Sequence, residues 1–242
     1  MHIAILMTNT DESDFAQRHP KDGEKFSNLM HLVRPDWDMS VYSVKDGVFP
    51  EDWQKYDGFM ITGSPASVRD TDDWVQQLLE LIRDIYASGT PMFGACFGHQ
   101  AIALALGGEI GDNPDGWEFG LCERDVVAHK PWTLGMGDTQ IQYGAHIEQV
   151  VKAPEGAEVL VSTPAVPNAG FAIGDTVYTT QNHPEMTPDF AAALVEEYAE
   201  KLPADVAKRA QNSLAREAET KAYAETIARF FEHATQSTTA DP

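Results

Sequence analysis

One cysteine stands at the point where an apolar segment gives way to a segment rich in helix-forming residues. The motif Gly94-Ala95-Cys96-Phe97-Gly98 follows the short apolar stretch Thr90–Phe93 and precedes Gln100–Leu106, which stops at a glycine pair. Gly-x-Cys-x-Gly is the thiol version of a nucleophile elbow, a turn so tight that only small residues fit two positions to either side. The strained turn exposes the sulfur, and the helix N-terminus behind it favours the thiolate. We therefore predict that Cys96 is a nucleophile rather than a buried small hydrophobe.

A cysteine nucleophile needs a nearby histidine, and that histidine needs a carboxylate to orient it. Two segments have the form His-x-acid: His146-Ile147-Glu148 and His183-Pro184-Glu185. In extended backbone, residues two apart point the same way, so either segment could supply the pair. Pro184 stiffens the second link and favours His183, while His99 lies on the elbow helix without an obvious carboxylate. Cys-rich and His-x-x-x-His spacings are absent, so no metal site is expected.

The elements before and around this cysteine alternate in the order β-α-β-β-α-β-α, which predicts a mostly parallel sheet with helices on both faces. Functional sites in such sheets lie at the carboxyl ends of the strands, where Gly63-Ser64 and Cys96 both fall. The expected strands are His2–Met7, Met39–Val44, Tyr56–Thr62 and Thr90–Phe93, and the expected helices are Glu24–Val33, a segment from Thr71–Asp73 to about Ala87, and Gln100–Leu106.

The second half of the chain has the pattern of a smaller mixed or antiparallel sheet followed by helices. Its expected strands are Glu118–Ala128, Thr139–Tyr143, Glu158–Ser162, Gly170–Ile173 and Thr176–Thr180. Helices are expected over Asp189–Lys201 and over Ala204–His233, with a frayed end at Gln236–Pro242. We predict one α/β domain over residues 1–202, with residues 203–242 forming a helical extension packed on it.

Composition excludes several classes of protein. The chain has 242 residues, 43% of them hydrophobic, and a formal net charge of −21, which disfavours a nucleic-acid or anionic-membrane surface. No stretch has the length of a membrane span, and the N-terminus lacks the basic region of a signal peptide. Two cysteines do not make a disulfide framework, so we expect a cytoplasmic protein with free thiols.

Three segments together resemble the signatures of class I glutamine amidotransferases. They are Gly94–Gln100, Gly63-Ser64-Pro65 and Gln181-Asn182-His183-Pro184-Glu185, and the resemblance is closest to stand-alone members similar to the glutaminase domain of GMP synthase. It covers about the first 200 residues and implies a flavodoxin-like fold. Two positions depart from the family pattern: Ser64 stands where a second glycine is common, and Asn182 where an aromatic residue is common.

The resemblance also implies a role for each matching residue. Cys96 would be the nucleophile, His183 the general base and acid, and Glu185 the residue that orients His183. The remaining matches are substrate-binding or oxyanion positions, namely Gly63, Ser64, Phe97, Gln100 and His146. No cofactor is implied.

The activity that the resemblance implies is cleavage of the γ-amide of glutamine through a thioester on the cysteine. The released ammonia would pass to a synthetase or acceptor subunit, because no phosphate-binding loop follows the motifs in this chain. The alternative is a γ-glutamyl peptidase or hydrolase that acts on larger γ-glutamyl compounds. A non-catalytic regulatory or binding subunit is the third interpretation.

Overall fold

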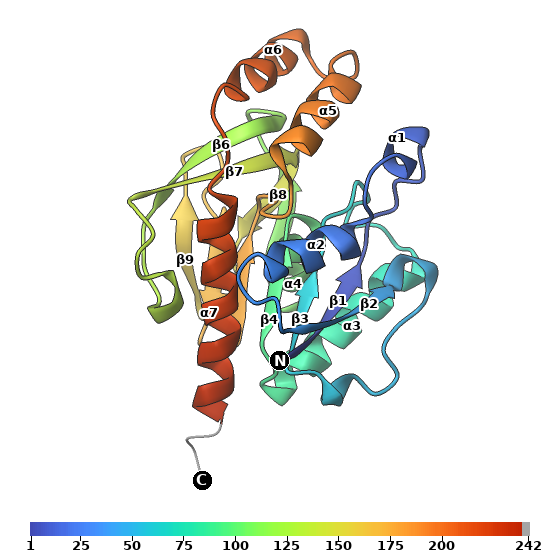
Figure 1. Cartoon of the computed structure of the whole chain (residues 1–242), viewed down its shortest axis with the longest axis vertical. Coiled ribbons are helices and arrows are strands. Elements are labelled where there is room, and N and C mark those ends of the chain that lie inside the picture. Colours follow the sequence, from blue (N-terminus) through green and yellow to red (C-terminus); the bar gives the residue numbers. More distant parts are fainter. Residues whose placement is uncertain (239–242) are drawn as a thin grey trace.

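The computed structural model describes residues 1–238, in which nine strands form one sheet with helices on both faces (Figure 1). The strand order is β2-β1-β3-β4-β11-β10-β9-β6-β7, with parallel pairing from β2 to β11 and antiparallel pairing from β11 to β7. The α/β class and the parallel core of the sheet are confirmed. In chain order the strands are β1 (His2–Met7), β2 (Asp38–Ser43), β3 (Gly58–Ile61), β4 (Met92–Ala95), β6 (Glu118–Val126), β7 (Thr139–His146), β9 (Ala157–Ser162), β10 (Gly170–Ile173) and β11 (Val177–Thr180).

Alternating side chains of the parallel strands fill two separate cores. On β1, Ile3 and Ile5 pack with residues of α2 and α7, whereas Ala4 and Leu6 pack on the opposite face with α3 and α4. All four side chains are fully buried, as expected for strands covered on both faces. Figure 1 shows α2 and α7 in front of the sheet. The four helices are α2 (Asp22–His31), α3 (Asp73–Ser88), α4 (Phe97–Ala105) and α7 (Thr220–Thr238).

The C-terminal part departs from the prediction of one helix over Ala204–His233. The chain forms α5 (Pro188–Tyr198), then α6 (Ala204–Ser213), and α7 begins only at Thr220. The frayed end expected over Gln236–Pro242 stays a prediction: α7 continues to Thr238, and residues 239–242 lie outside the described part. The domain boundary at residue 202 stays a prediction, although α7 is an integral part of the core on one face of the sheet.

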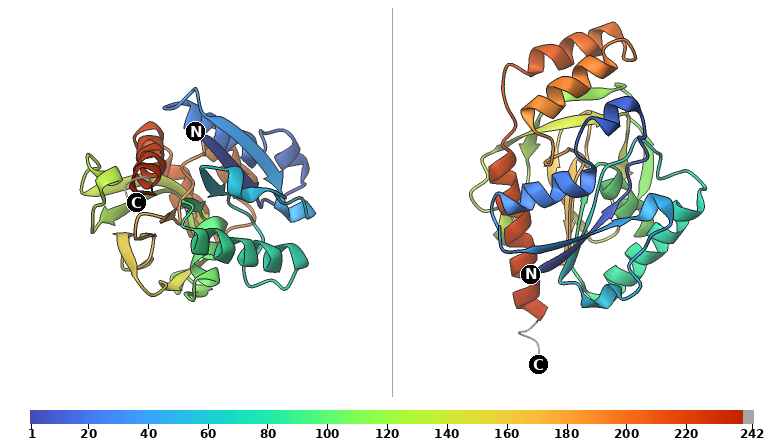
Figure 2. Two further views of the ribbon diagram at one scale, coloured as in Figure 1. Left: turned by 90° about the horizontal axis from the view of Figure 1, so that it is seen from below. Right: turned by 45° about the vertical axis from the view of Figure 1, so that its right-hand side comes forward.

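A second, two-stranded antiparallel sheet is formed by β5 (Glu109–Asp112) and β8 (Glu148–Lys152). The sequence analysis did not predict these strands, because β5 is short and has no fully buried residue. The predicted antiparallel strands instead extend the main sheet. Beyond the carboxyl ends of the parallel strands lie α5, α6 and the short α1 (Asp14–Gln17), as Figures 1 and 2 show.

Candidate active site

The turn between β4 and α4 has the strained geometry that the glycine spacing predicts. Cys96 has φ 51° and ψ −107°, and it is the only non-glycine residue of residues 1–238 with a positive φ. A Cβ on Gly94 would lie 2.6 Å from the backbone of Gly98, and a Cβ on Gly98 would lie 2.3 Å from the carbonyl oxygen of Ile61. Both glycines are therefore required by close backbone approach, with α4 packed directly against β3.

Neighbouring strands bring the cysteine and the predicted histidine together. β4 and β11 pair in parallel with Ala95 opposite Thr180, and the N–H of Cys96 donates to the Thr180 carbonyl at 2.9 Å. Beyond β11 the chain turns toward β7, where the N–H of His183 donates to the carbonyl of Tyr143 at 2.8 Å. The register of two adjacent strands thus places two residues that are distant in sequence at one edge of the sheet.

His183 forms a close, buried pair with Glu185. Its Nδ1 lies 2.7 Å from Glu185 Oε1, and side-chain exposure is 9% for the histidine and 2% for the glutamate. Burial by itself lowers the pKa of His183, but the charges of Cys96 and Glu185 together raise it well above its usual value. A Cβ on Gly63 would lie 2.7 Å from His183 Cε1 and 3.6 Å from Cys96 Cβ, so all three residues meet.

The predicted oxyanion residues lie on the two backbone segments that flank this meeting point. Phe97 is the first residue of α4, where N–H groups have no acceptor within the helix, and its ring stacks on Trp74 at 5.5 Å. Gly63 and Ser64 follow β3, whose end is anchored by a hydrogen bond from Thr8 Oγ1 to the Gly63 carbonyl at 3.0 Å. Ser64 does not need a left-handed conformation, so a side chain at this position adds no backbone strain.

Gln100 and His146 are buried and bonded to the protein, and neither is among the residues that line the cavity described below. Gln100 Nε2 donates to the Glu148 carbonyl at 2.8 Å, and His146 Nδ1 lies 3.1 Å from the same oxygen. The two residues therefore tie α4 to the β7–β8 turn. His146 does not pair with the Glu148 carboxylate, which instead accepts from Ser67 and Arg69.

The third candidate histidine is a packing residue. His99 is fully buried, its Nδ1 lies 2.8 Å from Thr179 Oγ1, and its ring contacts Phe171. Burial lowers the pKa of His99 to about 3, so the ring is neutral at physiological pH. Within residues 1–238, no group of three or more His, Cys, Asp or Glu is placed to hold a metal ion.

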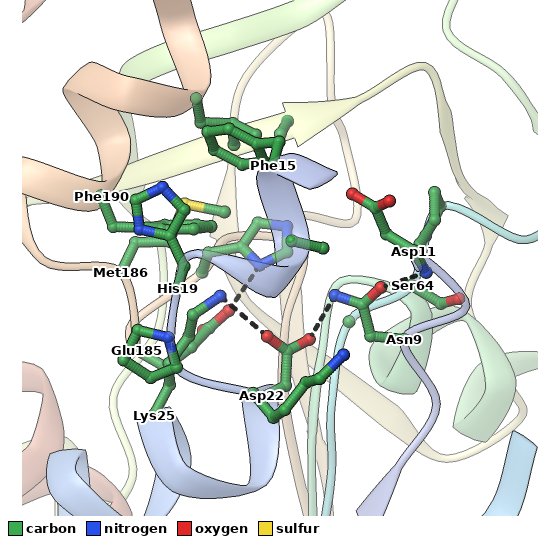
Figure 3. Close-up of a pocket in the computed structure, with 18 of the residues that line it drawn as sticks. Asn9, Asp11, Phe15, His19, Asp22, Lys25, Ser64, Glu185, Met186 and Phe190 are labelled. Atoms are coloured by element: carbon green, nitrogen blue, oxygen red, sulfur yellow. Dashed lines mark hydrogen bonds and ion pairs between the residues drawn. The ribbon is translucent and has the colours of Figure 1, made fainter. Parts of the chain in front are cut away.

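A cavity of about 360 Å³ opens beside His183 and Glu185. One wall is apolar and consists largely of the rings of Phe15 and Phe190 together with Met186 (Figure 3). The ring centroids of Phe15 and Phe190 are 5.9 Å apart, so the loop that carries α1 is packed against α5. A volume of this size lies within the range of pockets that enclose drug-sized ligands.

The opposite wall is polar and is supplied by the N-terminal loop and the start of α2 (Figure 3). Asp22 is 5% exposed; its carboxylate accepts from Asn9 Nδ2 at 2.8 Å and from Lys25 Nζ at 2.9 Å. Lys25 Nζ also lies 3.6 Å from the centroid of Phe190, which connects the two walls. These residues were missed by the sequence analysis, which began the helix at Glu24, whereas α2 begins at Asp22 and so includes this acid in its first turn.

A protein-family model and several known proteins match the sequence of this chain. The family model of class I glutamine amidotransferases matches residues 28–197. A γ-glutamyl peptidase 3 of Arabidopsis thaliana is 32% identical over 168 residues, which cover 66% of this chain and 67% of the relative. A glutamine-hydrolysing GMP synthase of Aeropyrum pernix is 33% identical over 129 residues, covering 53% of this chain but 24% of the synthase.

Solved structures share the fold over nearly the whole chain. A glutamine amidotransferase of Thermotoga maritima superposes with a TM-score of 0.76 at 16% identity, covering 96% of this chain and 98% of the other. A glutamine amidotransferase of Methylobacillus flagellatus gives a TM-score of 0.71 at 21% identity, with coverages of 96% and 94%. Within residues 1–238, none of the helices combines the length and apolar character needed to cross a bilayer.

Proposed function

Because this chain belongs to the class I glutamine amidotransferase family, we propose that it hydrolyses γ-glutamyl amide bonds, with glutamine as the simplest substrate. The observation that carries the proposal is the meeting of Cys96, His183 and Glu185, with the sulfur-bearing residue on a strained elbow and the histidine 2.7 Å from its carboxylate. This arrangement has the roles of a nucleophile, a base and an orienting acid.

In the first half-reaction, the Cys96 thiolate attacks the γ-carbonyl carbon and forms a C–S bond. The resulting oxyanion accepts hydrogen bonds from backbone N–H groups at Gly63–Ser64 and at Phe97, each such donor contributing about 3 kcal/mol to lowering the barrier. The His183 imidazolium then protonates the leaving nitrogen as the C–N bond breaks. Ammonia or an amine departs, and a γ-glutamyl thioester remains on Cys96.

In the second half-reaction, neutral His183 removes a proton from water, which attacks the thioester carbonyl. The same N–H groups stabilise the second oxyanion, the C–S bond breaks, and glutamate leaves. The thiolate and the imidazolium are thereby restored. Glu185 carries no proton in either step; it holds His183 in one orientation and stabilises its positive charge.

A second candidate function, cleavage of larger γ-glutamyl compounds, is favoured by the size and lining of the cavity. Ammonia is small and needs little space beside His183, yet a cavity of about 360 Å³ extends from there to the aromatic wall. An amine with an apolar body would bury that body against Phe15 and Phe190. With glutamine as substrate, ammonia would pass to an acceptor subunit or to solvent.

Replacing Phe190 with alanine should separate these two candidates. Loss of the ring removes apolar contact with a bulky leaving group worth about 1.5–3 kcal/mol, so kcat/KM for γ-glutamyl-phenylalanine should fall roughly 10- to 100-fold. For glutamine, kcat/KM should change little. Tyr86→Ala, on the exposed side of α3, is the matched control. Equal losses on both substrates would contradict an aromatic leaving-group subsite.

The proposed chemistry is tested on the purified wild-type chain with glutamine and with γ-glutamyl-phenylalanine. Glutamate release is measured with either ammonia or phenylalanine as co-product, and acid-quenched samples are digested and analysed by mass spectrometry. We expect a glutamyl adduct on the peptide containing Cys96. If neither substrate yields glutamate or an adduct, the proposed function is wrong.

A further inference from the structure

Arg124 is a charged side chain on β6, the strand next to the edge of the antiparallel half of the sheet. It lies on β6 opposite Gln140 of β7 and is 1% exposed, one of the largest fully buried side chains in residues 1–238. Arginine is almost never fully buried unless it is paired, because an unpaired buried charge is very costly. The groups that contact the Arg124 guanidinium therefore indicate the structural role of its charge.

These partners lead toward the catalytic histidine. Arg124 Nη2 donates to Glu118 Oε2 at 2.7 Å, while Nε and Nη2 both donate to Asn182 Oδ1, at 3.1 and 3.0 Å. Asn182 is the residue directly before His183. Two N–H groups of the planar guanidinium thus donate to a single side-chain oxygen, which fixes both the orientation and the distance of the Asn182 amide relative to Arg124.

Within residues 1–238, the side chain of Asn182 makes hydrogen bonds to Arg124 alone. The backbone on either side of it is held separately, because the Gln181 N–H donates to the Ala169 carbonyl at 2.7 Å and the His183 N–H to the Tyr143 carbonyl at 2.8 Å. Beyond Thr180 the chain leaves β11, and the Asn182 N–H donates to Thr180 Oγ1 at 3.2 Å. Asn182 is fully buried, yet its Nδ2 has no hydrogen-bond partner among the described residues. The orientation of the Asn182 side chain consequently depends on Arg124.

The same guanidinium also fixes the histidine of the neighbouring strand. Arg124 Nη2 lies 3.2 Å from His146 Nε2, so the arginine nitrogen shares its two hydrogens among His146, Glu118 and Asn182. His146 Nδ1 faces a carbonyl oxygen, which can only accept, so Nδ1 carries the ring proton. That proton then points to the Glu148 carbonyl, the oxygen that Gln100 of α4 also contacts. Burial, followed by the charge of Arg124, lowers the pKa of His146 well below its usual value. Arg124 is therefore linked both to the segment with His183 and to the helix that follows Cys96.

We infer that Arg124 is a positioning residue for catalysis, which holds Asn182 and thereby the imidazole of His183 in register with the Cys96 sulfur. The inference rests on the proposed function. A displacement of about 1 Å between reacting groups can reduce turnover about 10²-fold. Because Arg124 contacts neither Cys96 nor the cavity lining, its loss should reduce kcat and leave KM nearly unchanged.

Arg124→Ala and Asn182→Ala are the variants that test the inference, with Arg216→Ala as control. Arg216 pairs with Glu123 on the surface of the same strand, with both side chains more than half exposed. We expect kcat to fall about 10²-fold in each test variant. The double variant should show the same loss as either single variant, because both substitutions remove the same contact between Arg124 and Asn182. Millimolar guanidinium should restore part of the kcat of Arg124→Ala, whereas urea at the same concentration should not.

Each outcome decides the inference. A folded Arg124→Ala protein with wild-type kcat overturns the inference. A reduced kcat in Arg124→Ala also overturns it if guanidinium does not raise that kcat and if the loss in the double variant equals the two single losses combined. If Arg124→Ala does not fold, Asn182→Ala alone decides between a reduced and an unchanged kcat at constant KM. An inactive wild-type protein would instead refute the proposed function, so the two failures are distinguishable.

Discussion

Replacing Cys96 with alanine should remove turnover on every γ-glutamyl substrate and leave the fold unchanged. Alanine keeps the Cβ, so the backbone at φ 51° and the packing around the turn are the same as in the native protein. Only the sulfur is lost, and without it no thioester can form. Loss of the nucleophile from a comparable triad costs about 10⁶-fold in kcat. Glutamate release and the adduct on the Cys96 peptide are the measurements.

Cys122→Ala is the matched control for this experiment. Cys122 is half-buried, and desolvation by the surrounding protein raises the pKa of its thiol to about 12, so it stays protonated at neutral pH and is a poor nucleophile. Iodoacetamide should therefore label Cys96 in the wild type and in Cys122→Ala, and should label neither cysteine in Cys96→Ala. Residual turnover in Cys96→Ala, or loss of turnover in Cys122→Ala, would place the nucleophile elsewhere.

The elbow could be predicted from the sequence because its constraint is local. Gly94 and Gly98 lie within two residues of Cys96, and the close approaches that require them are visible as a spacing. Pro184 likewise restricts the backbone between His183 and Glu185, which distinguishes that pair from His146-Ile147-Glu148. The order of strands and helices could also be predicted, because apolar strands and amphipathic helices are local sequence patterns.

The other residues of the site are positioned by tertiary contacts, which cannot be predicted from the spacing of residues in the sequence. The substrate-binding roles that the resemblance implies for Gln100 and His146 stay predictions, and the contacts of both residues with the Glu148 carbonyl of β8 could not be predicted because β8 has no clear sequence pattern. In the sequence, Arg124 has no feature that distinguishes it from other strand residues, whereas in the structure it contacts His146 of β7 and Asn182 after β11. The positioning role that we propose for Arg124 rests on tertiary hydrogen bonds, which the sequence does not reveal.

The break between α6 and α7 was missed because both helices are amphipathic and their apolar spacings join without a gap. Val206 and Ala210 of α6 pack with Phe119 of β6, whereas Tyr223 and Ile227 of α7 pack with the main core. One straight helix could not reach both surfaces. The position of the break is therefore set by tertiary packing rather than by helix propensity.

Replacing Glu185 with glutamine should reduce kcat about 10²- to 10⁴-fold, the usual contribution of positioned acid–base catalysis. Glutamine keeps the volume and an oxygen that can accept from His183 Nδ1, now 2.7 Å from Glu185 Oε1. It lacks the negative charge that favours the imidazolium. Both the orientation of the ring and its ability to protonate the leaving nitrogen are therefore weakened.

The pH dependence of Glu185→Gln distinguishes the loss of charge from a loss of packing. Burial lowers the pKa of His183 while Cys96 and Glu185 raise it, so removing one of the two charges must lower that pKa. Above its pKa the imidazole cannot protonate the leaving amine, so the alkaline limb of kcat/KM should move to lower pH in the variant. Glu148→Gln is the matched control, because its carboxylate pairs with Ser67 and Arg69 and not with a histidine. An alkaline limb that stays in place in Glu185→Gln would show that the carboxylate does not set the protonation of His183.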